Sequence, residues 1–165
     1  MPKALQGVEE FYAHAIAIER EAVERYREFE GWFADRGEEV LAGLCRNLAG
    51  LEADHLRQVE HASRGLVIPA IDASRHQWLE TGPPETLARD LFYRMAEPRH
   101  LLEVVLQAEC NALAFFEWVG RTSPDTRVRF LAREMAAEEQ QHVQWAAKAL
   151  EYHVPRHPAW ESVLP

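Results

Sequence analysis

Six ionisable residues stand where helices would place their apolar faces. Four long segments carry apolar residues at steps of three and four, the spacing of the buried side of an amphipathic helix. In the middle of each stripe a glutamate replaces the apolar residue, and in two stripes a histidine follows three positions later. The six residues are Glu19, Glu52, His55, Glu109, Glu139 and His142. The pattern predicts four carboxylates and two imidazoles in the core.

Such a cluster calls for a cation. A buried carboxylate without a partner is costly, and four of them close together would also repel one another. Carboxylate oxygens and imidazole nitrogens are donors that iron and manganese accept. One glutamate from each of two helices, with Glu-x-x-His from the other two, is the arrangement of di-iron and di-manganese bundles. The residues therefore predict a two-metal site and leave iron and manganese open.

The six residues also fall at one height of the predicted bundle. In a helical hairpin, residues equidistant from the turn lie side by side. Glu19 and His55 are equidistant from Gly37, and Glu109 and Glu139 are equidistant from Pro124. At the rise of an α-helix, all six lie within about 3 Å of one level. Both halves of the pattern recur about 90 residues later, which predicts two hairpins related by a pseudo-twofold axis.

Three further residues, Glu138, Tyr26 and His100, are not expected to be metal ligands. Glu138 offers a competing register with His142, but the apolar stripe favours Glu139, so Glu138 is expected to be solvated or to contact a ligand. Tyr26 lies two turns from Glu19 on the same face, and we expect it to pack, with a hydrogen-bonding or redox role as the alternative. A third Glu-x-x-His, ending at His100, lies at a helix end and is not expected to bind metal.

Helices must position these residues. Proline and glycine breakers leave helices over about 5–35, 38–63, 98–121 and 125–152, with Ser123 or Asp125 capping the last. Short turns make each pair an antiparallel hairpin. A long crossover over about 64–97, with a short helix near 85–95, joins the hairpins, and 153–165 form a tail. The prediction is all-α: one ferritin-like antiparallel four-helix bundle domain over 1–165.

Composition excludes other classes. The chain has 165 residues, 47% of them hydrophobic, which suits one domain with a real core, and its net charge of −9 argues against nucleic-acid or anionic-membrane partners. Two cysteines, Cys45 and Cys110, are too few for a disulfide framework or a four-cysteine rubredoxin-type iron site. Without a targeting segment or an apolar run of about 20 residues, a cytoplasmic protein is expected.

The run from Glu19 to Tyr26, both Glu-x-x-His motifs and Glu109 resemble the rubrerythrin-like branch of the ferritin-like superfamily, over about residues 5–152. The resemblance implies a non-haem di-iron site that reduces peroxide or oxidises ferrous iron with dioxygen. In it, Glu52 and Glu139 would bridge the metals and the other four residues would be terminal ligands.

The chain departs from rubrerythrins in two ways. It has no rubredoxin domain, so an external electron donor would be needed. Rubrerythrins also carry a further glutamate one turn after the third-helix ligand, where this sequence has Ala112. No methionine lies where the haem ligand of bacterioferritin is expected, so no haem is expected.

Two alternatives to a di-iron oxidoreductase stay open, namely a metal-binding or iron-handling protein without turnover and a di-manganese catalase-like enzyme. For assembly, Trp32, Trp118 and Trp145 are expected to add apolar surface outside the ligand stripes, and Trp118 to point away from the core. This predicts a homodimer packed through bundle helices. The alternative is that the crossover around Trp78 covers Trp118.

Overall fold

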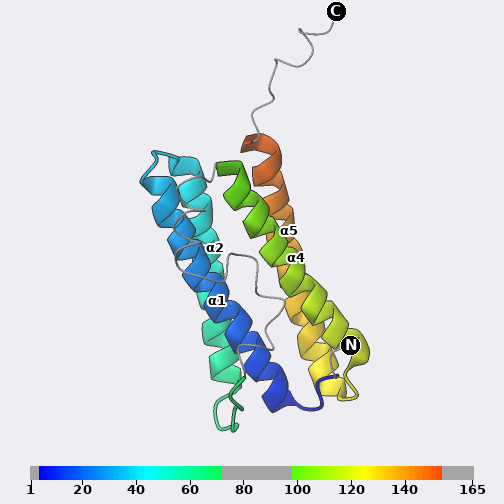
Figure 1. Ribbon diagram of the computed structural model, residues 1–165. Coiled ribbons are helices and arrows are strands. Elements are labelled where there is room, and N and C mark those ends of the chain that lie inside the picture. The colour runs from blue at the N-terminus through cyan, green and yellow to red at the C-terminus, as the bar shows by residue number, and fades with distance from the viewer. Residues whose placement is uncertain (1–3, 72–97, 154–165) are drawn as a thin grey trace, which may run out of the picture.

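The computed structural model describes residues 4–71 and 98–153, and these form four helices without a strand (Figure 1). The helices are α1 (Val8–Ala34), α2 (Glu39–Ala62), α4 (Pro98–Thr122) and α5 (Thr126–His153). α1 packs closely along α2, and α4 along α5, and the two antiparallel hairpins stand side by side. The predicted four-helix bundle of two hairpins is confirmed. The short helix expected near 85–95 and the tail from 154 lie outside the described residues.

The first hairpin turns where the sequence predicted. Gly37 has a φ of 74°, in the left-handed region that favours glycine. Its amide donates to the carbonyl of Ala34, and the amide of Glu38 donates to the carbonyl of Phe33. These bonds satisfy the last carbonyls of α1 and reverse the chain.

The start of α1 differs from the prediction. The helix begins at Val8 instead of residue 5, because Leu5 has a different partner. The hydroxyl of Ser123, between α4 and α5, donates to the carbonyl of Leu5 at 2.9 Å, and the Leu5 side chain is buried. The N-terminal segment is therefore fixed across the end of the second hairpin before the helix starts.

The core consists of two apolar clusters, one toward each end of the bundle. One contains Phe11, Phe116 and Val128, and the other contains Phe33, Leu48 and Leu101. Between them, at mid-height, the buried residues include the predicted glutamates. The apolar clusters supply the burial that stabilises the fold, and they leave one polar level between them.

Two of the three tryptophans are less exposed than expected. Trp32 is buried in one core cluster and packs against Phe33. Trp118 is half-buried because it packs against the other cluster, with its ring centroid 6.2 Å from that of Phe115. Trp145 is exposed, as predicted. The expectation that Trp118 points away from the core was therefore wrong, and the homodimer stays a prediction.

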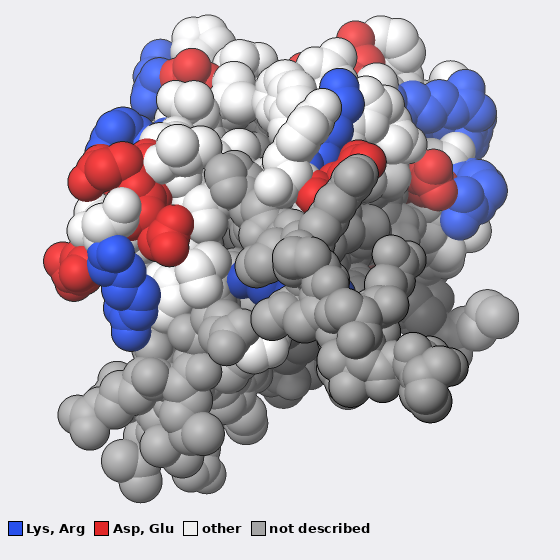
Figure 2. Space-filling view, turned by 90° about the horizontal axis from the view of Figure 1, so that it is seen from above, with Lys and Arg blue, Asp and Glu red and all other residues white. Residues whose placement is uncertain are grey.

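Charges are mixed on the face of the molecule that Figure 2 shows. Seen from above, Lys and Arg side chains alternate with Asp and Glu side chains over the described residues (Figure 2). Among those residues, no helix contains an apolar stretch long enough to traverse a lipid bilayer.

The start of α5 yields a stability prediction. Oδ1 of Asp125 accepts from the amides of Arg127 and Val128 at 2.8 and 3.3 Å, which caps the helix. Asp125→Ala should lower the free energy of unfolding by about 1 kcal/mol, the usual contribution of an N-cap. Urea denaturation measures it. Glu134→Ala, an exposed change in the same helix, should stay within about 0.5 kcal/mol of the parent, and an equal loss in both variants would contradict the capping role.

Candidate metal centre

All four helices contribute to one cluster of ionisable side chains. Glu19 comes from α1, Glu52 and His55 from α2, Glu109 from α4, and Glu139 and His142 from α5. Five of them are at most 2% exposed, and the side chain of His55 is 13% exposed. The structure therefore brings together all six residues that the sequence singled out.

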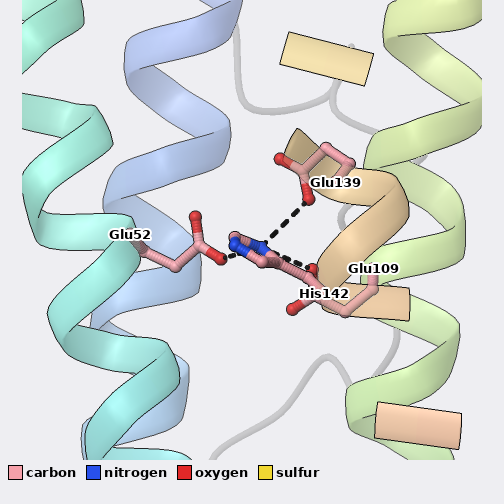
Figure 3. Close-up of side chains that lie close together, drawn as sticks. All are labelled: Glu52, Glu109, Glu139 and His142. Atoms are coloured by element: carbon pink, nitrogen blue, oxygen red, sulfur yellow. Dashed lines mark ion pairs between the residues drawn. The ribbon is translucent and has the colours of Figure 1, made fainter. Parts of the chain in front are cut away.

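His142 lies at the centre of the larger group. Its Nδ1 is 2.8 Å from Oε1 of Glu52, 3.3 Å from Oε2 of Glu109 and 3.5 Å from Oε2 of Glu139. Figure 3 shows these side chains pointing toward one another from α2, α4 and α5. One donor atom from each of the four lies within 4.8 Å of the others, so the group could hold a metal ion.

A second group lies beside the first and shares Glu52 with it. Nδ1 of His55 is 3.8 Å from Oε2 of Glu19 and 3.6 Å from Oε2 of Glu52, and the three donors also lie within 4.8 Å of one another. The imidazoles of His55 and His142 are stacked, with centroids 5.4 Å apart. Two groups that share one carboxylate have the arrangement of two cation positions with Glu52 between them.

Several buried polar atoms in this cluster have no hydrogen bond of normal geometry among the described residues. They are Oε1 and Oε2 of Glu19, Oε1 of Glu52, Nδ1 of His55 and Nδ1 of His142. Native proteins leave few buried polar atoms unpaired, because each unpaired atom costs free energy. All of these atoms belong to predicted ligands and face one another, so a bound cation would satisfy them together.

Two outer residues contact the ligands. The hydroxyl of Tyr26, which is buried, donates to Oε1 of Glu109. Burial and the Glu109 charge raise the pKa of Tyr26, so the phenol keeps its proton. Oε2 of Glu138 lies 3.5 Å from Nε2 of His55, on the imidazole edge that faces away from the carboxylates. Carboxylates commonly orient metal-binding histidines in this way. The contact of Tyr26 is the hydrogen-bonding alternative and not packing alone, and Glu138 contacts a predicted ligand.

Without a cation, burial and the neighbouring charges shift the pKa values of the carboxylates. Burial raises the pKa of Glu139 to about 8 and raises that of Glu19 as well. For Glu52 burial acts in the same direction, but the nearby His142 and His55 outweigh it and lower the pKa to about 2. Burial also disfavours the charge on His142, yet Glu109, Glu139 and Glu52 raise its pKa to about 12. The metal-free site therefore retains protons, which stand in for a cation.

A small cavity adjoins the cluster between α1 and α4. Its volume is about 30 Å³, and its lining includes Glu52, Glu109, Glu139 and Tyr26. Ala22 and Ala112 leave the space open, since larger side chains at these positions would fill it. One water molecule needs roughly 10–15 Å³ of cavity volume measured in this way. The cavity therefore has room for a molecule of about two heavy atoms. Spacing in the sequence gave no sign of this cavity, because it depends on how far apart α1 and α4 lie.

A second feature that sequence reasoning missed is the position of Trp145. Its ring lies 5.5 Å from that of His142 at an angle of 25°, while 39% of the residue is exposed. The spacing of three residues on one helix could have signalled the contact. It places an aromatic surface residue directly against the candidate metal site.

Comparison with known proteins supports the fold. No family model matches the chain. No curated protein matches it. The crystal structure of an uncharacterized conserved protein from Magnetospirillum magnetotacticum is similar, with 29% sequence identity and a TM-score of 0.78 over 88% of this chain and 95% of that one. The chain therefore has an all-α, ferritin-like four-helix bundle fold with a buried Glu/His group that could hold a metal ion.

These pKa shifts predict how the metal-free protein responds to pH. Glu139 and His142 bind protons more tightly in the folded state than at their ordinary pKa values of 4.5 and 6.5. Stability is then lost as pH rises, for Glu139 from about 5 to about 8 and for His142 from 6.5 upward. The lowered pKa of Glu52 makes the folded state lose stability as pH falls, but only below its ordinary pKa of 4.5. The melting temperature of chelator-treated protein should therefore fall between pH 5.5 and pH 8.

Calorimetry on metal-free and metal-loaded protein checks this. Protons compete with metal for the same atoms, so the stabilisation due to metal should grow over the same pH interval. A metal-free protein that becomes more stable toward pH 8 would contradict the burial of these carboxylates in one cluster.

Proposed function

We propose that this protein is a non-haem di-iron carboxylate protein that is redox-active toward peroxide, dioxygen or ferrous iron. The observation that carries the proposal is the set of buried donor atoms on Glu19, Glu52, His55 and His142, which face one another in the core without hydrogen bonds of normal geometry. When all four carboxylates are ionised they carry a charge of −4, which two divalent cations would neutralise. The resemblance to the rubrerythrin-like branch favours iron over manganese.

The residues would divide the ligand set into two halves. Glu52, Glu109, Glu139 and His142 would hold one ion, and Glu19, Glu52 and His55 the other. The sharing of Glu52 supports the bridging role that the resemblance implies, whereas Glu139 belongs to one group. Two iron ions bound there, each changing oxidation state by one, would supply two-electron chemistry.

The chain's own residues would control access and protons. The hydroxyl of Tyr26 donates to Glu109 and holds that carboxylate in position. The cavity beside Tyr26 admits a molecule of about two heavy atoms, which is the size of hydrogen peroxide or dioxygen. The two apolar clusters exclude bulk water from the level between them. These features favour a small oxidant over an organic substrate.

Substitution of a ligand should empty the site. Glu52→Ala removes the carboxylate that both groups share, and His142→Ala removes the nitrogen that approaches three carboxylates. Metal analysis should find well below two ions per chain in either variant. His100→Ala, in the third Glu-x-x-His and exposed at the start of α4, should retain the metal. Full metal content in both ligand variants would refute the assignment.

Filling the cavity should slow the reaction and leave the metals in place. Ala112→Leu places a larger side chain beside Glu109 and Tyr26. Stopped-flow oxidation of the ferrous protein by hydrogen peroxide should slow by roughly tenfold or more, because the oxidant no longer fits next to the ligands. Ala114→Leu, the same change at an exposed position of the same helix, is the matched control. Equal rates in the two variants would show that oxidant enters elsewhere.

A further inference from the structure

A large groove lies on the other side of the candidate metal site, along α2 and α5 and beside α1. Its volume is about 1000 Å³. Leu44, Leu48 and Leu51 of α2 and Trp145 of α5 supply apolar walls. Clefts of this size with apolar and aromatic walls are typical of binding sites for small molecules.

Trp145 connects this groove to the ligands. It lines the groove with 39% of its surface exposed. Its ring stacks on that of His142, which in turn stacks on that of His55. A flat ring bound against the open face of Trp145 would therefore lie one aromatic side chain away from His142.

The groove is locally basic in an acidic protein. Four cations line it, namely Arg27, Arg46, Arg57 and Lys148. Arg46 pairs with Glu30 at 2.7 Å, and Arg57 pairs with Asp54. Arg27 and Lys148 make no ion pair within the part of the chain that the structure describes, which leaves two uncompensated positive charges. Both lie about two turns beyond a ligand of their own helix, toward the end of the bundle with the α1–α2 turn.

We propose that this groove binds a small redox nucleotide, a flat aromatic ring joined to a phosphate, with the ring on Trp145 and the phosphate at Arg27 and Lys148. Aromatic rings stack favourably on tryptophan, and a phosphate dianion matches the two uncompensated charges. An acidic electron-transfer protein fits less well, because the net charge of −9 would repel it at long range.

The role of the bound nucleotide as electron donor rests on the proposed function, which needs an external donor. The binding of the nucleotide does not rest on it. A reduced flavin satisfies the balance with peroxide: the flavin loses two electrons and two protons, the O–O bond breaks, and two waters form. Binding itself requires no metal, so the groove can be tested separately from the metal centre.

Isothermal titration calorimetry with flavin mononucleotide, on metal-free and on metal-loaded protein, tests the site. Riboflavin, which has the ring without the phosphate, is the comparison ligand. The double variant Arg27→Ala/Lys148→Ala should weaken flavin mononucleotide binding by tenfold or more and leave riboflavin binding unchanged. Trp145→Leu should weaken the binding of both ligands. Arg127→Ala, an exposed cation near the other end of α5, should change neither.

A parallel titration with NADPH distinguishes the two sources of this chemistry. Binding of either nucleotide with the stated dependence on Trp145, Arg27 and Lys148 supports the proposal and identifies the ring. The proposal is overturned if neither nucleotide binds, or if substitution of these three residues leaves the affinity unchanged. It is also overturned if only an acidic redox protein binds. The titrations on metal-free protein do not depend on the metal centre. If the protein proved unable to bind metal, the proposed function would be refuted, but the result for nucleotide binding would still hold.

Discussion

The structure depends on the electrostatic balance of four carboxylates held at one level of an apolar core. Glu19, Glu52, Glu109 and Glu139 are almost fully buried, and each comes from a different helix. Their repulsion would separate the helices unless positive charge lies among them. His55 and His142 provide part of it when protonated. The buried donor atoms without hydrogen bonds of normal geometry indicate where a cation would provide the rest. The rest of the fold surrounds this level and holds it in place.

This balance also links the two halves of the bundle. Close helix packing is concentrated within each hairpin, between α1 and α2 and between α4 and α5. The polar level spans both hairpins, since His142 of α5 approaches Glu52 of α2. A cation there would therefore bind the hairpins to each other. The same wide spacing leaves room for a small cavity on one side and a large groove on the other.

Much of the site could be predicted from the sequence because helical periodicity fixes both face and height. Glu109 and Glu139 are equidistant from their turn, so their convergence follows from the hairpin alone. The contact of Tyr26 with Glu109 could not be assigned, because it crosses from one hairpin to the other. Trp118 was misplaced because the half-buried flank of a helix extends beyond its central stripe. The groove at Trp145 depends on the separation of α2 and α5, which no local pattern encodes.

The central claim is that two metal ions lie among these six residues. A crystal structure of the protein grown with ferrous iron, with anomalous diffraction recorded above and below the iron and manganese absorption edges, tests it most directly. The account predicts two anomalous peaks per chain, one within reach of His142 and Glu109, one within reach of His55 and Glu19, with Glu52 between them. The account would be contradicted by a metal-free cluster with protonated carboxylates hydrogen-bonded to one another, or by peaks only at surface sites.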